Sequence, residues 1–229
     1  MKTAIMQPYL FPYIGYFQLM TAVDNFVFYD TANFIKGGWI NRNRILGQDG
    51  WQYWGLKVHG SSNLEIRNVE LAGDPAYMKG RLLKTLDQVY SKAPYRNDVL
   101  DVVANSLVPG ISISEIAIRS CINVFRYLDE ELPLLKYSSG FRLQFMSRND
   151  KIVYMGERVG TRTYINAIGG KGLYNQRDFP FTLRFLRTGN IVYSQKSDEF
   201  IPNLSIIDVL MFNSPERVRE FLTNYTLEK

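Results

Sequence analysis

The sequence predicts an α/β protein with a mostly parallel, doubly wound (Rossmann-like) sheet, an antiparallel hairpin insertion and a helical C-terminus. Short apolar runs alternate with amphipathic segments at both ends of the chain, a pattern typical of parallel strands joined by helices. The 229 residues contain no internal repeat and no obvious linker. We therefore expect one domain over residues 1–229.

The first part of the chain begins with an apolar strand, and a segment with helical apolar spacing follows it. A hairpin insertion is expected over 39–58, because Gln48-Asp49-Gly50 can supply its turn. The expected elements are strand 2–6, helix 13–22, strand 26–30, paired strands near 39–46 and 53–58, and a strand near 66–71.

A helical segment over 75–129 follows, and Pro109-Gly110 and Pro133 punctuate it. Strands and helices then alternate again. Ser147 stands where a helix N-cap belongs, and Gly160 stands where a residue of positive φ ends a helix. The expected elements are helices 75–91, 96–107 and 113–129, strand 134–138, helix 148–158, strand 163–166, strand 181–186 and two C-terminal helices.

The composition excludes several kinds of site and compartment. One cysteine, Cys121, and one histidine, His59, leave no disulfide and no thiolate-rich or imidazole-rich metal centre, so no metal is expected. Cys121 falls on the apolar face of its predicted helix and should be buried. No signal-peptide core or membrane-spanning run occurs, which predicts a cytoplasmic protein without a membrane span. The net charge of +5 suits a small anionic ligand as well as a nucleic acid.

The first strand ends in an aromatic loop that is the strongest candidate for a binding site. Gln7 offers an amide, Tyr9, Tyr13 and Tyr16 offer hydroxyl groups, and Gly15 allows close approach to the first turn of the helix. At the carboxyl edge of a parallel sheet, such a junction favours a negatively charged ligand. The alternative is a rigid aromatic turn that packs the hairpin onto the sheet.

A second group of candidates follows the second strand. Asp30 ends that strand, so it should emerge at the same edge as Gln7. Trp39 offers a stacking surface, and Lys36 or an arginine could bind phosphate. The run Asn41-Arg42-Asn43-Arg44 should place its asparagines on one face of a strand and its arginines on the other, with one pair facing the site. The alternative is a solvated edge strand.

Three weaker candidates complete the site. His59 is a candidate general base because imidazole is the side-chain group whose unperturbed pKa suits proton transfer near neutral pH, although a lone histidine at a strand end more often has no catalytic role. The loop of Asn166, Gly169 and Gly170 follows a short strand and could bind an oxygen through backbone N–H groups, or simply form a tight turn. Ser205 and Asp208 have the spacing of a capping box, which explains them without a ligand, although a helix start at this edge could also point at the site.

Four segments of the chain together resemble the WbqC-like family of bacterial proteins, which occurs among genes for O-antigen and other surface polysaccharides. They are Met6–Phe17 with Asp30, Trp39-Ile40-Asn41-Arg42-Asn43, Tyr164-Ile165-Asn166-Ala167-Ile168-Gly169-Gly170, and Phe200–Asp208. The resemblance covers essentially the whole chain. Tyr13-Ile14-Gly15-Tyr16 is also similar in placement to the H-x-G-H element of adenylate-forming nucleotidyltransferases, but tyrosines replace both histidines, which argues against ATP-driven adenylation.

The WbqC-like resemblance implies modification of an amino sugar. We expect an N-acyl or aminoacyl, possibly glycyl, transferase that acts on a nucleotide-linked amino sugar and uses an activated thioester donor, with no bound cofactor. Asp30 or His59 would move the proton, Gln7, Tyr9, Tyr13 and Tyr16 would contact the sugar and the oxyanion, and Trp39, Asn41 and Arg42 would contact the nucleotide. Alternatives are a non-catalytic protein that binds the sugar nucleotide or an acyl carrier protein and, with less support, a nucleic-acid-binding protein.

Overall fold

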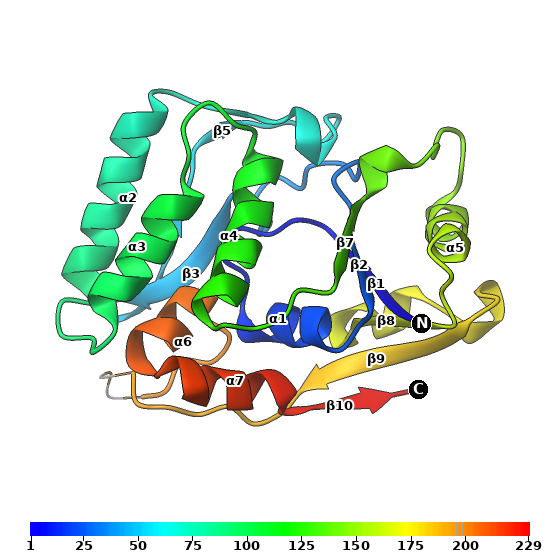
Figure 1. The fold of residues 1–229 in the computed structure, drawn as a ribbon. Coiled ribbons are helices and arrows are strands. Elements are labelled where there is room, and N and C mark those ends of the chain that lie inside the picture. Colours follow the sequence, from blue (N-terminus) through cyan, green and yellow to red (C-terminus); the bar gives the residue numbers. More distant parts are fainter. Residues whose placement is uncertain (196, 198) are drawn as a thin grey trace.

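The computed structural model describes residues 1–195, 197 and 199–229. Within these ranges, six strands form a central sheet in the order β10-β9-β8-β1-β2-β7, and every neighbouring pair except β10 with β9 is parallel (Figure 1). The prediction of an α/β chain with a mostly parallel sheet is confirmed. The strands are β1 (Lys2–Met6), β2 (Asn25–Phe28), β7 (Leu134–Tyr137), β8 (Thr163–Ala167), β9 (Thr182–Thr188) and β10 (Tyr225–Glu228).

The sheet is buried on both faces because successive residues of its strands point into two different apolar clusters. Ala4 and Phe26 belong to the larger cluster, whereas their neighbours Ile5 and Val27 belong to the smaller one. The α5 helix contributes to the smaller cluster, and the other helices that flank the sheet contribute to the larger one. These helices are α1 (Ile14–Thr21), α4 (Ile113–Tyr127), α5 (Arg148–Arg158), α6 (Ile206–Phe212) and α7 (Pro215–Thr223).

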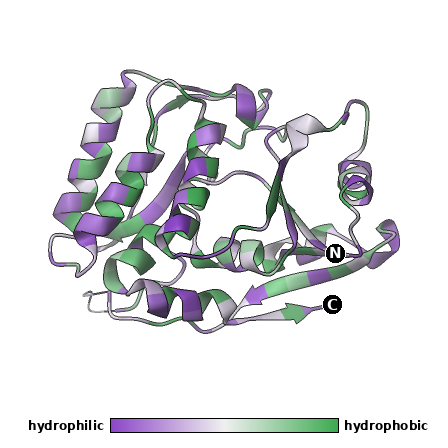
Figure 2. Ribbon diagram, in the orientation of Figure 1, coloured by the Kyte–Doolittle hydropathy of each residue, from purple (hydrophilic) through white to green (hydrophobic). Residues whose placement is uncertain are grey.

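Two further helices, α2 (Pro75–Val89) and α3 (Arg96–Ser106), lie at the end of the molecule away from β10 (Figure 1). Hydrophilic and hydrophobic residues alternate along both ribbons in Figure 2, as expected for helices with one buried face. Their bounds, and those of α4 and α5, agree closely with the predicted helices. Ser147 caps α5, and Gly160 after it has a φ of +72°, as predicted.

The predicted hairpin forms a two-stranded sheet of its own, β3 (Arg42–Gly47) and β4 (Gly50–Gly55). Gln48 and Asp49 make its two-residue turn, and Gly50 follows with a φ of +126°. The first strand is shorter than the predicted 39–46, and the second lies three residues before the predicted 53–58. A second small pair joins β5 (Val58–His59) to β6 (Glu70–Leu71).

Two predictions of secondary structure are wrong. The expected strand at 66–71 is a 3-10 turn at Ile66–Asn68 followed by the two residues of β6. The C-terminus is not wholly helical, because β10 follows α7 and pairs antiparallel with β9. Both errors have the same cause: the hydrogen bonds that settle these segments go to residues far away in the sequence.

Candidate functional site

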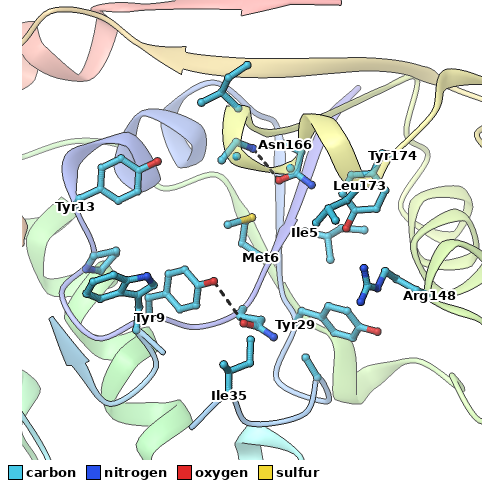
Figure 3. A pocket seen from close by; sticks show the side chains of 18 of the residues that line it. Ile5, Met6, Tyr9, Tyr13, Tyr29, Ile35, Arg148, Asn166, Leu173 and Tyr174 are labelled. Atoms are coloured by element: carbon cyan, nitrogen blue, oxygen red, sulfur yellow. Dashed lines mark hydrogen bonds between the residues drawn. The ribbon is translucent and has the colours of Figure 1, made fainter. Parts of the chain in front are cut away.

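A cavity lies at the edge of the sheet beside β1 and β8, the two neighbouring strands from which the chain continues in opposite directions. From β1 the chain proceeds to β2 on one side, whereas from β8 it proceeds to β9 on the other. Parallel α/β sheets bind ligands beyond the carboxyl ends of strands at such a reversal. Here a cavity of about 1030 Å³ has Met6 and Gln7 at the end of β1, and Asn166 and Ala167 at the end of β8, among its lining residues (Figure 3).

The cavity brings together three segments that the sequence predicts for the site: the loop after β1, the approach to the hairpin and the loop after β8. Several predicted residues of these segments line it. They are Gln7, Tyr9, Tyr13, Trp39, Asn43, Asn166, Gly169 and Gly170.

The loop between β1 and α1 has an unusual backbone held by polar side chains. Phe11 has a φ of 40°, in the left-handed region that bulky residues rarely occupy. Its carbonyl accepts hydrogen bonds from Asn43 Nδ2 at 3.0 Å and from Ser205 Oγ at 2.7 Å, and its N–H donates to Ser120 Oγ at 3.0 Å. Three distant elements therefore fix the loop that carries Tyr9 and Tyr13, as expected at a functional site.

The phenols of this loop are hydrogen-bond donors at neutral pH. Burial raises the pKa of both Tyr9 and Tyr13, so both hydroxyl groups stay protonated. The Tyr9 hydroxyl donates to the side-chain oxygen of Gln7 at 3.4 Å, which leaves the NH2 of Gln7 for a ligand. Across the cavity, Asn166 donates to the hydroxyl of Tyr164 at 3.2 Å and accepts from the N–H of Ala167 at 2.7 Å.

Positive charge dominates the cavity wall. Arg44, Arg148, Lys151 and Arg187 line it, and among the described lining residues there is no aspartate or glutamate. The sequence indicates none of the four by itself as a site residue. Arg148 and Lys151 are two positions in an ordinary predicted helix, and only the packing of this helix in the fold brings them to the cavity. Arg44 is predicted only as one of a pair with Arg42.

Asp30, predicted as a proton acceptor, lies outside the cavity lining. Its carboxylate is buried and accepts hydrogen bonds from Ser138 Oγ at 2.7 Å, from the Ser139 N–H at 2.9 Å and from Ser139 Oγ at 2.6 Å. Both carboxylate oxygens therefore accept hydrogen bonds from these serines. The structure therefore gives Asp30 the role of anchoring the turn after β7.

The other predicted base and the predicted phosphate ligand also lie elsewhere. His59 is exposed in β5, where its backbone lies opposite that of Glu70 in β6, and it does not line the cavity. Lys36 is exposed in the loop before the hairpin, and it too is absent from the lining.

The alternation predicted for residues 41–44 does not divide them as expected. Asn43 and Arg44, neighbours in sequence, line the cavity, whereas Asn41 and Arg42 do not. Asn41 donates to the carbonyl of Leu56 at 2.7 Å, and the guanidinium of Arg42 lies 3.9 Å from the centre of the Tyr53 ring. Asn43 instead turns inward to the β1–α1 loop, and Arg44 donates to the carbonyl of Asn203 at 3.1 Å.

Gly15 and Tyr16 support the site without lining it. Tyr16 is buried, and its hydroxyl donates to the Gln7 carbonyl at 2.9 Å. At Gly15, a Cβ atom would come within 2.4 Å of the Tyr13 ring and 2.5 Å of Thr188 Oγ1. Glycine is therefore required there because side chains of the protein itself, and not a ligand, cover the first turn of α1.

Comparison with known proteins settles the family. The chain matches the WbqC-like protein family over residues 7–220. It belongs to the WbqC-like protein family. This WbqC-like chain is also 26% identical over 229 residues to the uncharacterized protein Rv1507c of Mycobacterium tuberculosis (strain ATCC 25618 / H37Rv), with 96% of this chain and 97% of that protein covered. No solved structure matches the chain.

A second polar cluster of the WbqC-like chain lies around Asp208. The Asp208 carboxylate accepts hydrogen bonds from Tyr90 at 2.9 Å, Tyr193 at 2.6 Å and Gln195 at 2.9 Å. Burial raises its pKa to about 6. Ser205 caps α6 by accepting from the N–H of Ile207, but Asp208 does not complete the expected capping box, because its side chain points into the interior instead.

The remaining features of this WbqC-like protein concern its thiol, its possible metal ligands and its helices. Cys121 is fully buried, and burial raises the pKa of its thiol to about 12, so it stays protonated. In the described ranges no group of three or more histidine, cysteine, aspartate or glutamate residues is arranged to hold a metal ion. Every helix described is too short or too polar to span a bilayer.

Proposed function

We propose that this protein binds a nucleotide-linked amino sugar in the cavity and transfers an acyl or aminoacyl group, such as glycyl, to the sugar amine. The single observation that carries the proposal is the combination found at the carboxyl edge of the sheet: phenol and indole rings, amide side chains and four cations around one cavity. Aromatic rings suit a base or a sugar face, and cations suit a diphosphate. The Rossmann-like arrangement predicted from the sequence is consistent with a nucleotide at this edge.

The proposed reaction needs alignment more than acid–base chemistry. The amine nitrogen attacks the carbonyl carbon of a thioester, a C–N bond forms and the C–S bond breaks, and the amine proton leaves with the thiolate as a free thiol. The protein would hold the amine near the carbonyl and stabilise the oxyanion, for which the NH2 of Gln7 and the hydroxyl of Tyr13 are the proposed donors. Surface-polysaccharide biosynthesis is the pathway that family membership suggests.

A direct assay tests the transfer. The protein is incubated with uridine-, thymidine- and guanosine-diphosphate-linked amino sugars, together with acetyl or glycyl thioesters, and products are identified by mass spectrometry. The expected result is an amide on the sugar, formed at least tenfold more slowly by Gln7→Ala and by Tyr13→Phe. Product formation without protein at the same rate, or no amide with any pair, would contradict the proposal.

A second candidate function is a non-catalytic protein that binds the sugar nucleotide or a carrier protein for another enzyme. One observation favours it: the described lining residues include no carboxylate, imidazole or thiol that could accept a proton. Calorimetry that detects sugar-nucleotide binding, combined with no turnover of any thioester, would support this candidate over the transferase.

A further inference from the structure

The two ends of the cavity differ in chemistry. Figure 3 shows Tyr9 and Tyr13 on one side of Met6, and Arg148 with Tyr29 and Tyr174 on the other. The first end is aromatic and includes residues of the β1–α1 loop. The second end combines a guanidinium with two phenols, and none of these three residues was predicted from the sequence as part of the site.

The position of Arg148 is fixed by the start of α5. Ser147 caps this helix by accepting from the N–H of Asp150, so Arg148 is its first residue. Lys151 lies three residues further along, nearly one helical turn, and therefore on the same face. Both residues line the cavity, and the Arg148 side chain extends between Tyr29 and Tyr174 (Figure 3).

The two phenols beside Arg148 keep their protons and are therefore available as donors. Burial raises the pKa of Tyr29 and of Tyr174, and the positive charge of Arg148 lowers both values by a smaller amount. Both hydroxyl groups therefore remain protonated at neutral pH.

Within the described part of the chain, neither Arg148 nor Lys151 forms an ion pair, whereas Arg187 on another wall of the cavity is paired with Glu228. The carboxylate of Glu65, whose charge raises the pKa of Tyr29, is itself paired with Arg67 at 2.7 Å. An arginine presents its donors in a planar fork that matches phosphate oxygens. An unpaired arginine and lysine beside two phenolic donors thus form a suitable place for a multiply charged anion.

The usual alternative position for phosphate, the first turn of the helix after β1, is closed. Gly15 is buried, and the ring of Tyr13 and the hydroxyl of Thr188 already occupy the space around it. An anion in this cavity therefore has to be held elsewhere on the wall.

We propose that the α5 end of the cavity, formed by Arg148, Lys151, Tyr29 and Tyr174, is the diphosphate subsite. From the diphosphate, the amino sugar extends past Met6 toward Tyr9 and Tyr13, where the donors proposed for the oxyanion lie. This assignment rests on the nucleotide-linked substrate proposed above, and it replaces the phosphate role predicted for Lys36 and Arg42. It also defines which end of the cavity holds the diphosphate of the substrate and which end holds the sugar.

Calorimetric titration with inorganic pyrophosphate and with uridine diphosphate tests the subsite. Arg148→Gln is expected to weaken binding of both ligands by roughly tenfold to a hundredfold, and Lys151→Gln is expected to weaken it by a smaller factor. Arg148 is exposed, so its replacement should not impair folding, which circular dichroism verifies. The matched control is Arg158→Gln at the other end of α5, where the guanidinium lies 5.2 Å from the Tyr154 ring centre and outside the cavity lining.

The outcomes separate the subsite from the reaction. Unchanged affinity in Arg148→Gln and Lys151→Gln would overturn the subsite and leave the nucleotide-sugar proposal intact. Equal losses in Arg148→Gln and Arg158→Gln would also overturn it, because they would indicate a general charge effect. Arg148-dependent binding without acyl transfer would support the subsite and overturn only the transferase. Failure of the wild-type protein to bind either ligand would overturn both proposals.

Discussion

The side-chain amide of Asn43 donates a 3.0 Å hydrogen bond to the carbonyl oxygen of Phe11. The same NH2 group also reaches the carbonyl of Leu10 at 3.2 Å, and its oxygen accepts from the N–H of Arg44. One buried amide therefore ties the hairpin to the aromatic loop after β1. Because Phe11 has a positive φ, this loop depends on such external bonds to keep its shape.

Replacing Asn43 should consequently disturb both stability and the site. Asn43→Ala is expected to lower the free energy of unfolding by about 1–3 kcal/mol, because two buried carbonyl groups lose a donor. Urea unfolding measures this effect, and Asn63→Ala in an exposed turn is the control. A stability equal to that of the control would show that the loop holds itself in place.

Gly15 and Gly80 form a matched pair for a second test. Gly15→Ala would bring a Cβ within 2.5 Å of Thr188 Oγ1 and against the Tyr13 ring, so we expect a loss of about 1–3 kcal/mol and a displaced Tyr13. Gly80 lies inside α2 with no atom within 4 Å of its would-be Cβ, so Gly80→Ala should raise stability by about 0.5–1 kcal/mol. Thermal or urea unfolding of both variants checks the opposite signs.

Asp30→Asn distinguishes an anchoring role from a catalytic one. One of the two oxygens that accept from Ser138 and Ser139 would become a donor, so we expect a loss of about 1–3 kcal/mol in stability. Activity per folded molecule, measured well below the unfolding temperature, should be retained. Loss of turnover with unchanged stability would indicate that Asp30 takes part in the reaction.

Asp208 predicts a pH dependence of stability. Its pKa is raised from 3.8 to about 6 in the folded protein, so folding favours its protonated form. The contribution of this group to stability is therefore greatest below about pH 4 and is lost as the pH rises through about 6, with a total of the order of 3 kcal/mol.

The measurement compares the pH dependence of urea unfolding in wild type and Asp208→Asn. The difference in stability between the two proteins should change with pH between about 4 and about 6 and become constant above it. Asp101→Asn, an exposed position on α3, should show no such change relative to wild type. A constant difference for Asp208→Asn across this range would contradict the assigned titration.

The sequence predicted what depends on local pattern. Short runs of strand-forming residues locate β1 and β8, and Ser147 and Gly160 locate the ends of α5. What it missed depends on distant partners. The position of Asp30 at the end of a strand predicts a site residue, and nothing in the neighbouring sequence indicates that Ser138 and Ser139 hydrogen-bond to its carboxylate.

The same limit explains the missing half of the site. The aromatic loop was found because its rings and amides are concentrated in one short segment. Arg148 and Lys151 lie on a helix whose spacing indicates only burial of one face, and their role depends on how that helix packs beside the loop after β8. Residues that act together but are dispersed along the chain leave no pattern to read in a single sequence.

The position of β1 between β2 and β8 determines when the cavity can exist during synthesis. Lys2 and Thr3 pair with Thr163 and Tyr164, so during synthesis β1 acquires its second neighbour only after all the residues between them have been made. Until then, one edge of β1 has unpaired backbone groups that can join other strands. Nascent chains halted before β8 should accordingly be prone to aggregate and unable to recognise any ligand.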